Sequence, residues 1–292
     1  MFKKIIMACL LTGMILTSCN KNTADTNSSP RRLTKAELYA DLKAFNAAHG
    51  VRPECSGFWS CLGKVAAVAG ADITGAAAGI VGVSEAAAAL GIATGGTGAI
   101  VTMAAGGAIS GGGASYAAAK AVYTAVAPNE EKYGNLNLDI PLEFHPLSDV
   151  GIKHNNAMYN IFFGGQELND SYYTGTLGVD RKYLPVVNSE IYQQKVQVAS
   201  DLGRDYVASG FDYAFLTNRA YETGLITDDM RQILYSFMEA YGTGADMENV
   251  INHYISVVDR SELTDIERTA LISGFIVASE SPYVFYNNVT ER

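Results

Sequence analysis

The stretch that decides the fold covers residues 65–119 and reads VAAVAGADITGAAAGIVGVSEAAAALGIATGGTGAIVTMAAGGAISGGGASYAAA. It contains 20 alanines and 13 glycines, and its only charged side chains are those of Asp72 and Glu85. Glycine costs about 1 kcal/mol relative to alanine at a helical position, so this stretch is a poor helix by itself. We expect it to form helices that are stabilised by close backbone packing.

Small and large side chains fall on different faces of these expected helices. Reading every fourth residue gives series that contain mainly glycine and alanine. Branched residues such as Val68, Ile73 and Ile80 lie mostly outside these series. This pattern resembles the glycine zippers of bacterial envelope proteins and pore-forming polypeptides, in which small faces let helices approach closely. Glycine clusters at 95–98 and 111–113 are the expected breaks between helices. The small residues that recur every fourth position include Gly75, Gly79, Gly91, Gly95, Gly107 and Gly111.

The sequence leaves two interpretations of this zipper segment, residues 64–127, open. Branched residues between 65 and 83 favour insertion into a bilayer by about 3 kcal/mol together, whereas Asp72 opposes insertion by about 2.5 to 3.5 kcal/mol. The segment either associates with a membrane or with copies of itself, or it packs as a hairpin inside its own domain. Asp72 and Glu85 accordingly mark a water-lined face or a helix end, or they are simply exposed or capping side chains.

The N-terminus has the features of a secretion signal. Lys3 and Lys4 precede a mostly apolar run at 5–16, and the run ends in Leu16-Thr17-Ser18-Cys19. Its length is below the roughly 20 residues that a membrane-spanning helix needs. The quartet resembles the lipobox of bacterial lipoproteins, which implies removal of the signal peptide, residues 1–18, and acylation of Cys19 by fatty acids such as palmitate. Asn20 replaces the Asp that retains such lipoproteins at the inner membrane, so the resemblance implies the outer membrane of the cell envelope.

The charge of the chain bears on its partners. It has 21 basic and 30 acidic residues, a formal net charge of −9, and therefore lacks the basic surface of a nucleic-acid-binding protein. The acidic excess lies mainly in residues 127–292 and is typical of a solvated surface.

Residues 19–33 are polar and rich in turn formers, which predicts a flexible tether behind the acylated cysteine. An ordinary cleavage site with an unmodified Cys19 is the alternative.

Residues 34–63 are expected to form a short helix followed by a cysteine loop. Thr34 and Glu37 have the spacing of a capping box. Cys55 and Cys61 are close enough in sequence to form a disulfide in an oxidising compartment, although two free thiols or a redox-sensitive site are alternatives. The loop and its flank carry Phe58, Trp59 and Lys64. These three residue types fit a membrane interface or an aromatic plug over a helix end.

Residues 128–292 predict a bundle of five or six helices that is acidic and rich in tyrosine. Ser148 or Asp149 is expected to cap a helix that runs through Phe163, and Asn188 or Ser189 is expected to cap the next. Thr227 and Thr264 mark later helix starts, whereas prolines make 135–146 an extended connector or a short edge strand. The predicted fold class is therefore mainly α, an Ala/Gly-rich helical hairpin followed by a C-terminal helical bundle.

Chemical motifs are few. His145 and His154 are candidate bases, but no nucleophile signature such as G-x-S-x-G accompanies them, and we expect no enzyme. We expect no cofactor and no metal site, because two cysteines without a nearby ligand pair supply too few zinc ligands.

Three hypotheses about function follow. The first is an envelope lipoprotein whose zipper associates with membrane or self-associates, with a membrane-permeabilising variant. The second is a lipid-tethered binding module whose bundle contacts a protein or a glycan, and the third, the weakest, is an enzyme.

Overall fold

The structure is a computed structural model that describes residues 31–49, 59–122, 136–242 and 246–290. Within these ranges only the backbone is described at 59–67, 121–122 and 282–290. All described helices belong to one compact unit, Leu33–Arg292. The sequence suggested three separate segments: a short helix with a cysteine loop at 34–63, the zipper segment at 64–127 and the C-terminal bundle at 128–292. The described helices of all three contribute to the same packed body.

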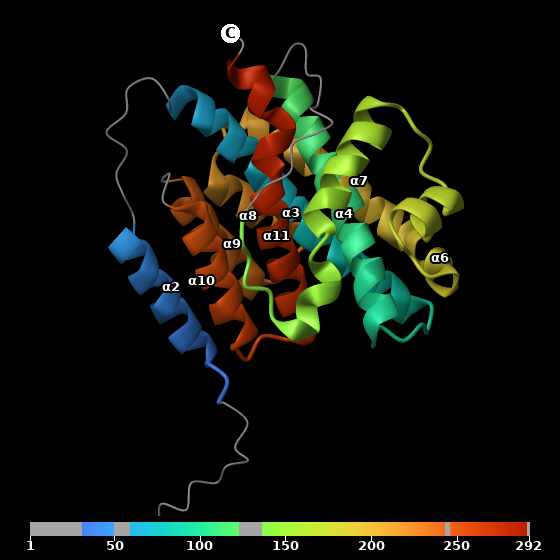
Figure 1. Ribbon diagram of the computed structural model, residues 1–292, viewed down its shortest axis with the longest axis horizontal. Coiled ribbons are helices and arrows are strands. Elements are labelled where there is room, and N and C mark those ends of the chain that lie inside the picture. The colour runs from blue at the N-terminus through green and yellow to red at the C-terminus, as the bar shows by residue number, and fades with distance from the viewer. Residues whose placement is uncertain (1–30, 50–58, 123–135, 243–245, 291–292) are drawn as a thin grey trace, which may run out of the picture. The chain divides into compact units, whose positions relative to one another are not determined.

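The fold is mainly α-helical, as predicted (Figure 1). In the described part of the chain, the sole β interaction is an isolated bridge between Leu33 and Ser261. No helix in these ranges combines the length and apolar character needed to cross a membrane. The longer helices are α2 (Lys35–His49), α3 (Trp59–Ala89), α4 (Thr97–Val122), α5 (Val150–Ala157), α7 (Glu190–Ala208), α8 (Tyr213–Glu222), α9 (Asp228–Gly242), α10 (Met247–Asp259) and α11 (Asp265–Thr290).

Short helical turns link these elements. A 3-10 turn, η1 (Leu142–Leu147), precedes α5, and a π-helix, η2 (Met158–Phe163), follows it. A second π-helix, η3 (Tyr172–Thr176), a 3-10 turn, η4 (Arg181–Tyr183), and the single turn α6 (Leu184–Val187) lead into α7. The connector expected at 135–146 is thus helical from Leu142 onwards and contains no strand within its described residues.

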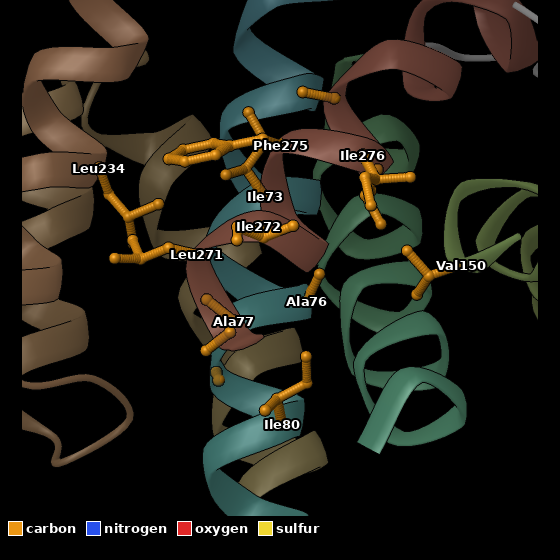
Figure 2. Packing of buried hydrophobic residues seen from close by; sticks show 14 of the residues in the cluster. Ile73, Ala76, Ala77, Ile80, Val150, Leu234, Leu271, Ile272, Phe275 and Ile276 are labelled. Carbon is orange, nitrogen blue, oxygen red and sulfur yellow. The ribbon is translucent and has the colours of Figure 1, made fainter. Parts of the chain in front are cut away.

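The Ala/Gly hairpin of α3 and α4 lies inside the bundle. The two helices contact each other, α3 also contacts α7, α8, α9 and α11, and α4 also contacts α5 and α7. Figure 2 shows Ile73 and Ala77 of α3 beside Leu271 and Phe275 of α11, and all four side chains are fully buried. A helix that is apolar on all sides is stable in water only when other helices cover it. Helices α5, α7, α8, α9 and α11 provide that cover.

Several of the predicted helix starts are visible as side-chain caps, whereas Asp149 before α5 makes no capping hydrogen bond. Thr34 and Glu37 form a reciprocal capping box before α2, and Thr264 and Glu267 form another before α11. Ser189 caps α7. The helix expected from Ser148 to Phe163 is α-helical only to Ala157, because the hydrogen-bond register then widens to that of a π-helix.

Four of the six zipper glycines lie where α3 meets α4. A Cβ atom on Gly79 would stand 2.4 Å from the carbonyl oxygen of Gly106, and one on Gly75 would stand 2.9 Å from Cα of Gly111. Gly107 and Gly111 approach the backbone of α3 in the same way, each 3.0 Å from a carbonyl oxygen. Glycine is needed there because any side chain would force the two backbones apart.

The remaining zipper glycines, Gly91 and Gly95, lie in the connection between the two helices. No atom stands within 4 Å of a Cβ placed on either residue, so they take no part in the helix contact. The break expected at 95–98 coincides with this connection, whereas the break expected at 111–113 is wrong, because α4 runs through all three glycines without interruption. Packing against α3, α5 and α7 keeps that weak helical stretch regular.

Candidate functional site

Several predicted site residues fall outside the described part of the structure. Cys19, Cys55 and Phe58 lie outside the described residues altogether. Trp59, Cys61 and Lys64 lie in the first turns of α3, and their side chains are not described. Acylation at Cys19, a Cys55–Cys61 disulfide and the membrane-interface role of Phe58, Trp59 and Lys64 therefore remain predictions.

Asp72 lies at the centre of a polar cluster buried between three helices. Its Oδ1 atom is 3.4 Å from Nε2 of His154 on α5, and its Oδ2 atom accepts a hydrogen bond from the hydroxyl of Ser281 on α11. The side chains of Asp72 and His154 are fully buried. The sequence suggested that Asp72 lies on a water-lined face or in an exposed or capping position. Neither interpretation describes this buried carboxylate, which instead links α3 to α5 and α11.

The surroundings of His154 favour its charged form. Nδ1 of His154 is 3.0 Å from Oδ1 of Asn155, whose amide group donates to the carbonyl oxygen of Glu280. That donation fixes Oδ1 as an acceptor, so Nδ1 carries a proton. Burial alone lowers the pKa of His154, but the charge of Asp72 and hydrogen bonds to Asp72 and Asn155 outweigh burial and raise the pKa above 6.5. Asp72 and His154 therefore form a buried ion pair.

The cluster contains Asp, His and Ser, but its order differs from that of a hydrolytic triad. In a triad the serine hydroxyl contacts the histidine, which takes up its proton. Here Ser281 donates to Asp72, and the carboxylate stands between the serine and the imidazole. Ser281 and His154 are also shielded from solvent, so a substrate has no route to either. The arrangement holds helices together.

Glu85, the other acid of the zipper segment, is exposed. Its carboxylate lies 3.1 Å from the Lys195 ammonium group of α7. An exposed ion pair of this kind contributes about 0 to 1 kcal/mol. Glu85 thus matches the solvent-exposed interpretation, with an added contact to α7.

The other histidines lie apart from this cluster. His49 and His253 stack on the two faces of Phe45, with ring centroids 4.2 and 3.9 Å away. Nε2 of His253 is 2.8 Å from Asp41, and burial lowers the pKa of His253 despite that carboxylate. His145 contacts the carbonyl oxygen of Ile140. His145 and His154, the two candidate bases in the sequence, are held in different settings.

Tyrosine contributes more to the core than to the surface. Tyr173, Tyr192, Tyr206 and Tyr254 are among the largest fully buried side chains. Burial raises the pKa of Tyr173 and of Tyr254 to about 12, so both stay neutral. Tyr221 and Tyr235 are exposed, on α8 and α9 respectively. The high tyrosine content of the bundle therefore does not by itself define a binding surface.

A polar groove of about 430 Å³ opens where the N-terminal ends of α4 and α11 meet η1. The groove, here called the Arg268 groove, contains three kinds of side chain. Glu143 and Asp265 supply carboxylates, and Arg268 supplies a guanidinium group. Hydroxyl groups come from Thr94, Thr264 and Thr269. The apolar wall consists of Ile100, Met103, Phe144 and Ile266. Its volume lies in the range of 300 to 1,000 Å³ that is common for small-molecule sites.

Arg268 organises the groove through ion pairs. Its guanidinium group lies 2.7 Å from Glu143 and 2.6 Å from Asp265, and its own side chain is only 4% exposed. Burial lowers the pKa of Arg268, but the hydrogen bond and charge of Asp265 and of Glu143 outweigh burial and raise the pKa above its usual value. Glu143 and Asp265 are themselves 54% and 87% exposed, so each also faces water. The two acids therefore present hydrogen-bond acceptors in the groove, beside its apolar wall.

Sequence reasoning did not single out Arg268, Ser281 or the groove. Arg268 stands one residue after the capping-box acid Glu267, and an arginine at that position is ordinary in a helix. Its pairing with Glu143, 125 residues away, leaves no local signal.

Comparison of the chain with protein-family models, with curated proteins and with solved structures gave no match. The chemistry of the site is therefore inferred from the chain's own residues.

Proposed function

We propose that the chain is a lipid-tethered binding module of the bacterial cell envelope, whose α3–α4 hairpin is a packed core and whose Arg268 groove binds a glycan. The burial of the hairpin carries this proposal. Asp72, Ile73 and Ile109 are fully covered by other helices, so the zipper surface is already occupied within the chain. Insertion into a membrane would require this core to open. The packed-hairpin interpretation therefore takes precedence over membrane association of the zipper.

The lipid tether rests on the residues around Cys19. Leu16-Thr17-Ser18-Cys19 behind Lys3, Lys4 and an apolar run is the lipoprotein pattern. Two or more acyl chains are sufficient for stable anchoring without a spanning helix. The compact unit begins only at Leu33, so residues 19–32 would separate the anchor from the fold.

The chemistry of the Arg268 groove favours a neutral polyhydroxyl ligand. The acids of Glu143 and Asp265 accept hydrogen bonds from hydroxyl groups, and they repel anions. Ile100 and Ile266 offer apolar surface for the C–H face of a sugar ring. A protein partner would bury about 800 Å² of surface on each side, so most of its contacts would lie outside this groove. A glycan of the envelope thus fits better than a folded protein.

Sedimentation with an insoluble, uncharged glycan tests the proposal. Chitin, a polymer of N-acetylglucosamine, is the probe, and the acylated protein is kept in a mild detergent. We expect the wild type to sediment, and Glu143→Gln to weaken its binding about 5- to 10-fold through loss of a charge-assisted hydrogen bond.

The matched control is Glu222→Gln, which removes an equally exposed acid that pairs with Arg219 away from the groove. This variant should bind like the wild type. Failure of the wild type to sediment, or an equal loss in both variants, would contradict binding in the groove.

A further inference from the structure

We propose that a second pocket, formed by α4, η2 and α7, binds a single-chain amphipathic anion of the fatty-acid class. The pocket measures about 540 Å³. Tyr116, Ala117 and Lys120 of α4 line one side, Phe162 of η2 lines another, and Ser200 and Arg204 of α7 complete it. None of these residues belongs to the Arg268 groove, so the proposal does not depend on glycan binding.

Aromatic rings form the apolar part of the pocket. Tyr116 and Phe162 stack with ring centroids 5.7 Å apart, and Phe163 meets the edge of Tyr116 at 5.0 Å. Phe162 and Phe163 are the last two residues of the π-helix, whose widened turn changes the direction in which successive side chains point. A π-helical turn is frequent at functional sites. These rings remain partly exposed, which leaves apolar surface that a ligand can cover.

Glycines of α4 let the aromatic wall approach closely. A Cβ on Gly112 would stand 3.0 Å from the Phe162 ring, and one on Gly113 would stand 2.6 Å from the Ser200 hydroxyl. The same glycine cluster that was expected to break the helix instead brings η2 and α7 against it. The pocket is thus built by the packing of three elements.

Two cations stand beside this apolar wall. The Lys120 ammonium group lies 5.5 Å from the centroid of the Tyr116 ring, and Arg204 is 61% exposed while it pairs with Asp201. Arg204 has five N–H donors, and a single carboxylate cannot use them all. The chain as a whole has a net charge of −9, so two cations around one apolar pocket are a local exception. They are placed to hold the charged head of a ligand whose tail covers the rings.

The combination of features selects among anions. Inorganic phosphate would use the cations and leave the aromatic wall in water. A two-chain lipid in a bilayer would present only its headgroup, because its chains stay in the membrane. A single alkyl chain with a carboxylate uses both parts of the pocket, and its size agrees with the pocket volume.

Titration with dodecanoate and with dodecanol tests this inference. The two probes share the alkyl chain and differ in charge. Residues 19–292 are used without acylation, since they contain the whole compact unit. We expect isothermal titration calorimetry to show at least 10-fold tighter binding of dodecanoate than of dodecanol. The double variant Lys120→Gln, Arg204→Gln should lose that preference and bind the two probes within 2-fold of each other.

Two further variants separate the pocket from general effects. Arg219→Gln removes an exposed arginine that also pairs with an acid three residues away, and it should bind dodecanoate like the wild type. Ala117→Phe fills the pocket without removing a charge and should reduce dodecanoate binding more than 10-fold, with circular dichroism verifying the fold. Glu143→Gln should leave dodecanoate binding unchanged, so failure here and failure of glycan binding are distinguishable.

Three results would overturn the inference. The first is equal affinity of the wild type for both probes. The second is unchanged dodecanoate binding in the Lys120, Arg204 double variant or in Ala117→Phe. The third is cosedimentation with phosphatidylglycerol vesicles that depends on Lys120 and Arg204 when dodecanoate does not bind, because this would assign the cations to a membrane surface.

Discussion

Asp72 of α3 and His154 of α5 form an ion pair across 3.4 Å in the interior of the bundle, where neither side chain is exposed. Placing two charges in such a setting costs several kcal/mol each, and the cost is offset only when both partners are present with hydrogen bonds to their remaining atoms. Ser281 and Asn155 supply those hydrogen bonds. The pair therefore couples the charge state of one histidine to the packing of the hairpin.

Removal of one partner should be strongly destabilising. We expect Asp72→Ala or His154→Ala to lower the free energy of unfolding by about 3 to 5 kcal/mol, because the remaining charge is left buried and unpaired. Urea unfolding followed by circular dichroism measures this change. Replacing both residues by leucine should cost less than either single change. In the Asp72→Ala, His154→Ala double variant, simple additivity of the two single effects would show that the residues do not form a pair.

The stability of the fold should fall as the solution becomes alkaline. The pKa of His154 is raised above 6.5 in the folded state. Between pH 6.5 and this folded pKa, the native protein therefore binds more protons than the unfolded chain. The free energy of unfolding must then decrease with rising pH across that interval. The contribution is complete below about pH 6.5 and is lost as the pH passes the folded pKa of His154.

His253 gives the opposite slope in a different interval. Burial lowers its pKa below 6.5, so its contribution rises with pH only below about pH 6.5 and is constant above that pH. Urea midpoints at several values between pH 6.5 and 9 therefore separate the effect of His154 from that of His253. The Asp72→Leu, His154→Leu double variant should lose the slope in this range, and persistence of the slope in that variant would assign it to another group.

Close approach of α3 and α4 makes Gly79 intolerant of larger side chains. Gly79→Leu places its Cβ 2.4 Å from the Gly106 carbonyl oxygen, so we expect a loss of about 3 kcal/mol or more in the free energy of unfolding. The matched control is Gly95→Leu, since no atom lies within 4 Å at that position. Thermal unfolding should show a large drop for the first variant and a change within about 0.5 kcal/mol for the second. Equal effects would argue against zipper packing.

Acylation of Cys19 is testable by metabolic labelling. Cells supplied with radioactive palmitate should label the wild type, and Cys19→Ser should remain unlabelled. Mass spectrometry of the purified protein should place the mature N-terminus at Cys19. An unlabelled wild type would remove the lipid tether from the proposed function and leave the fold and both pockets unaffected.

Local sequence signals predicted the elements of this fold well. Capping boxes at Thr34 and Thr264 mark the starts of α2 and α11, and Ser189 caps α7, because such signals depend on residues three or four positions apart. Alanine and glycine content predicted a closely packed hairpin. The coincidence of small residues with the α3–α4 contact is visible at Gly75 and Gly79.

Long-range pairing could not be predicted in the same way. Asp72 accepts a hydrogen bond from Ser281, which is 209 residues away in the sequence, and Arg268 donates one to Glu143, which is 125 residues away. Nothing near either residue in the sequence specifies its partner. The π-helical turn at Met158–Phe163 was also missed, since apolar spacing cannot distinguish it from an α-helical turn. Both candidate binding sites depend on such features, and a single sequence therefore did not reveal them.

Amide hydrogen exchange of residues 19–292, with and without phospholipid vesicles, tests most directly whether the α3–α4 hairpin is a packed core. Amides of α3 and α4 should exchange among the slowest in the chain, and vesicles should leave their rates unchanged. Fast exchange in these helices without vesicles, or a change in their protection when vesicles are added, would contradict a packed core and support association of the zipper with the membrane.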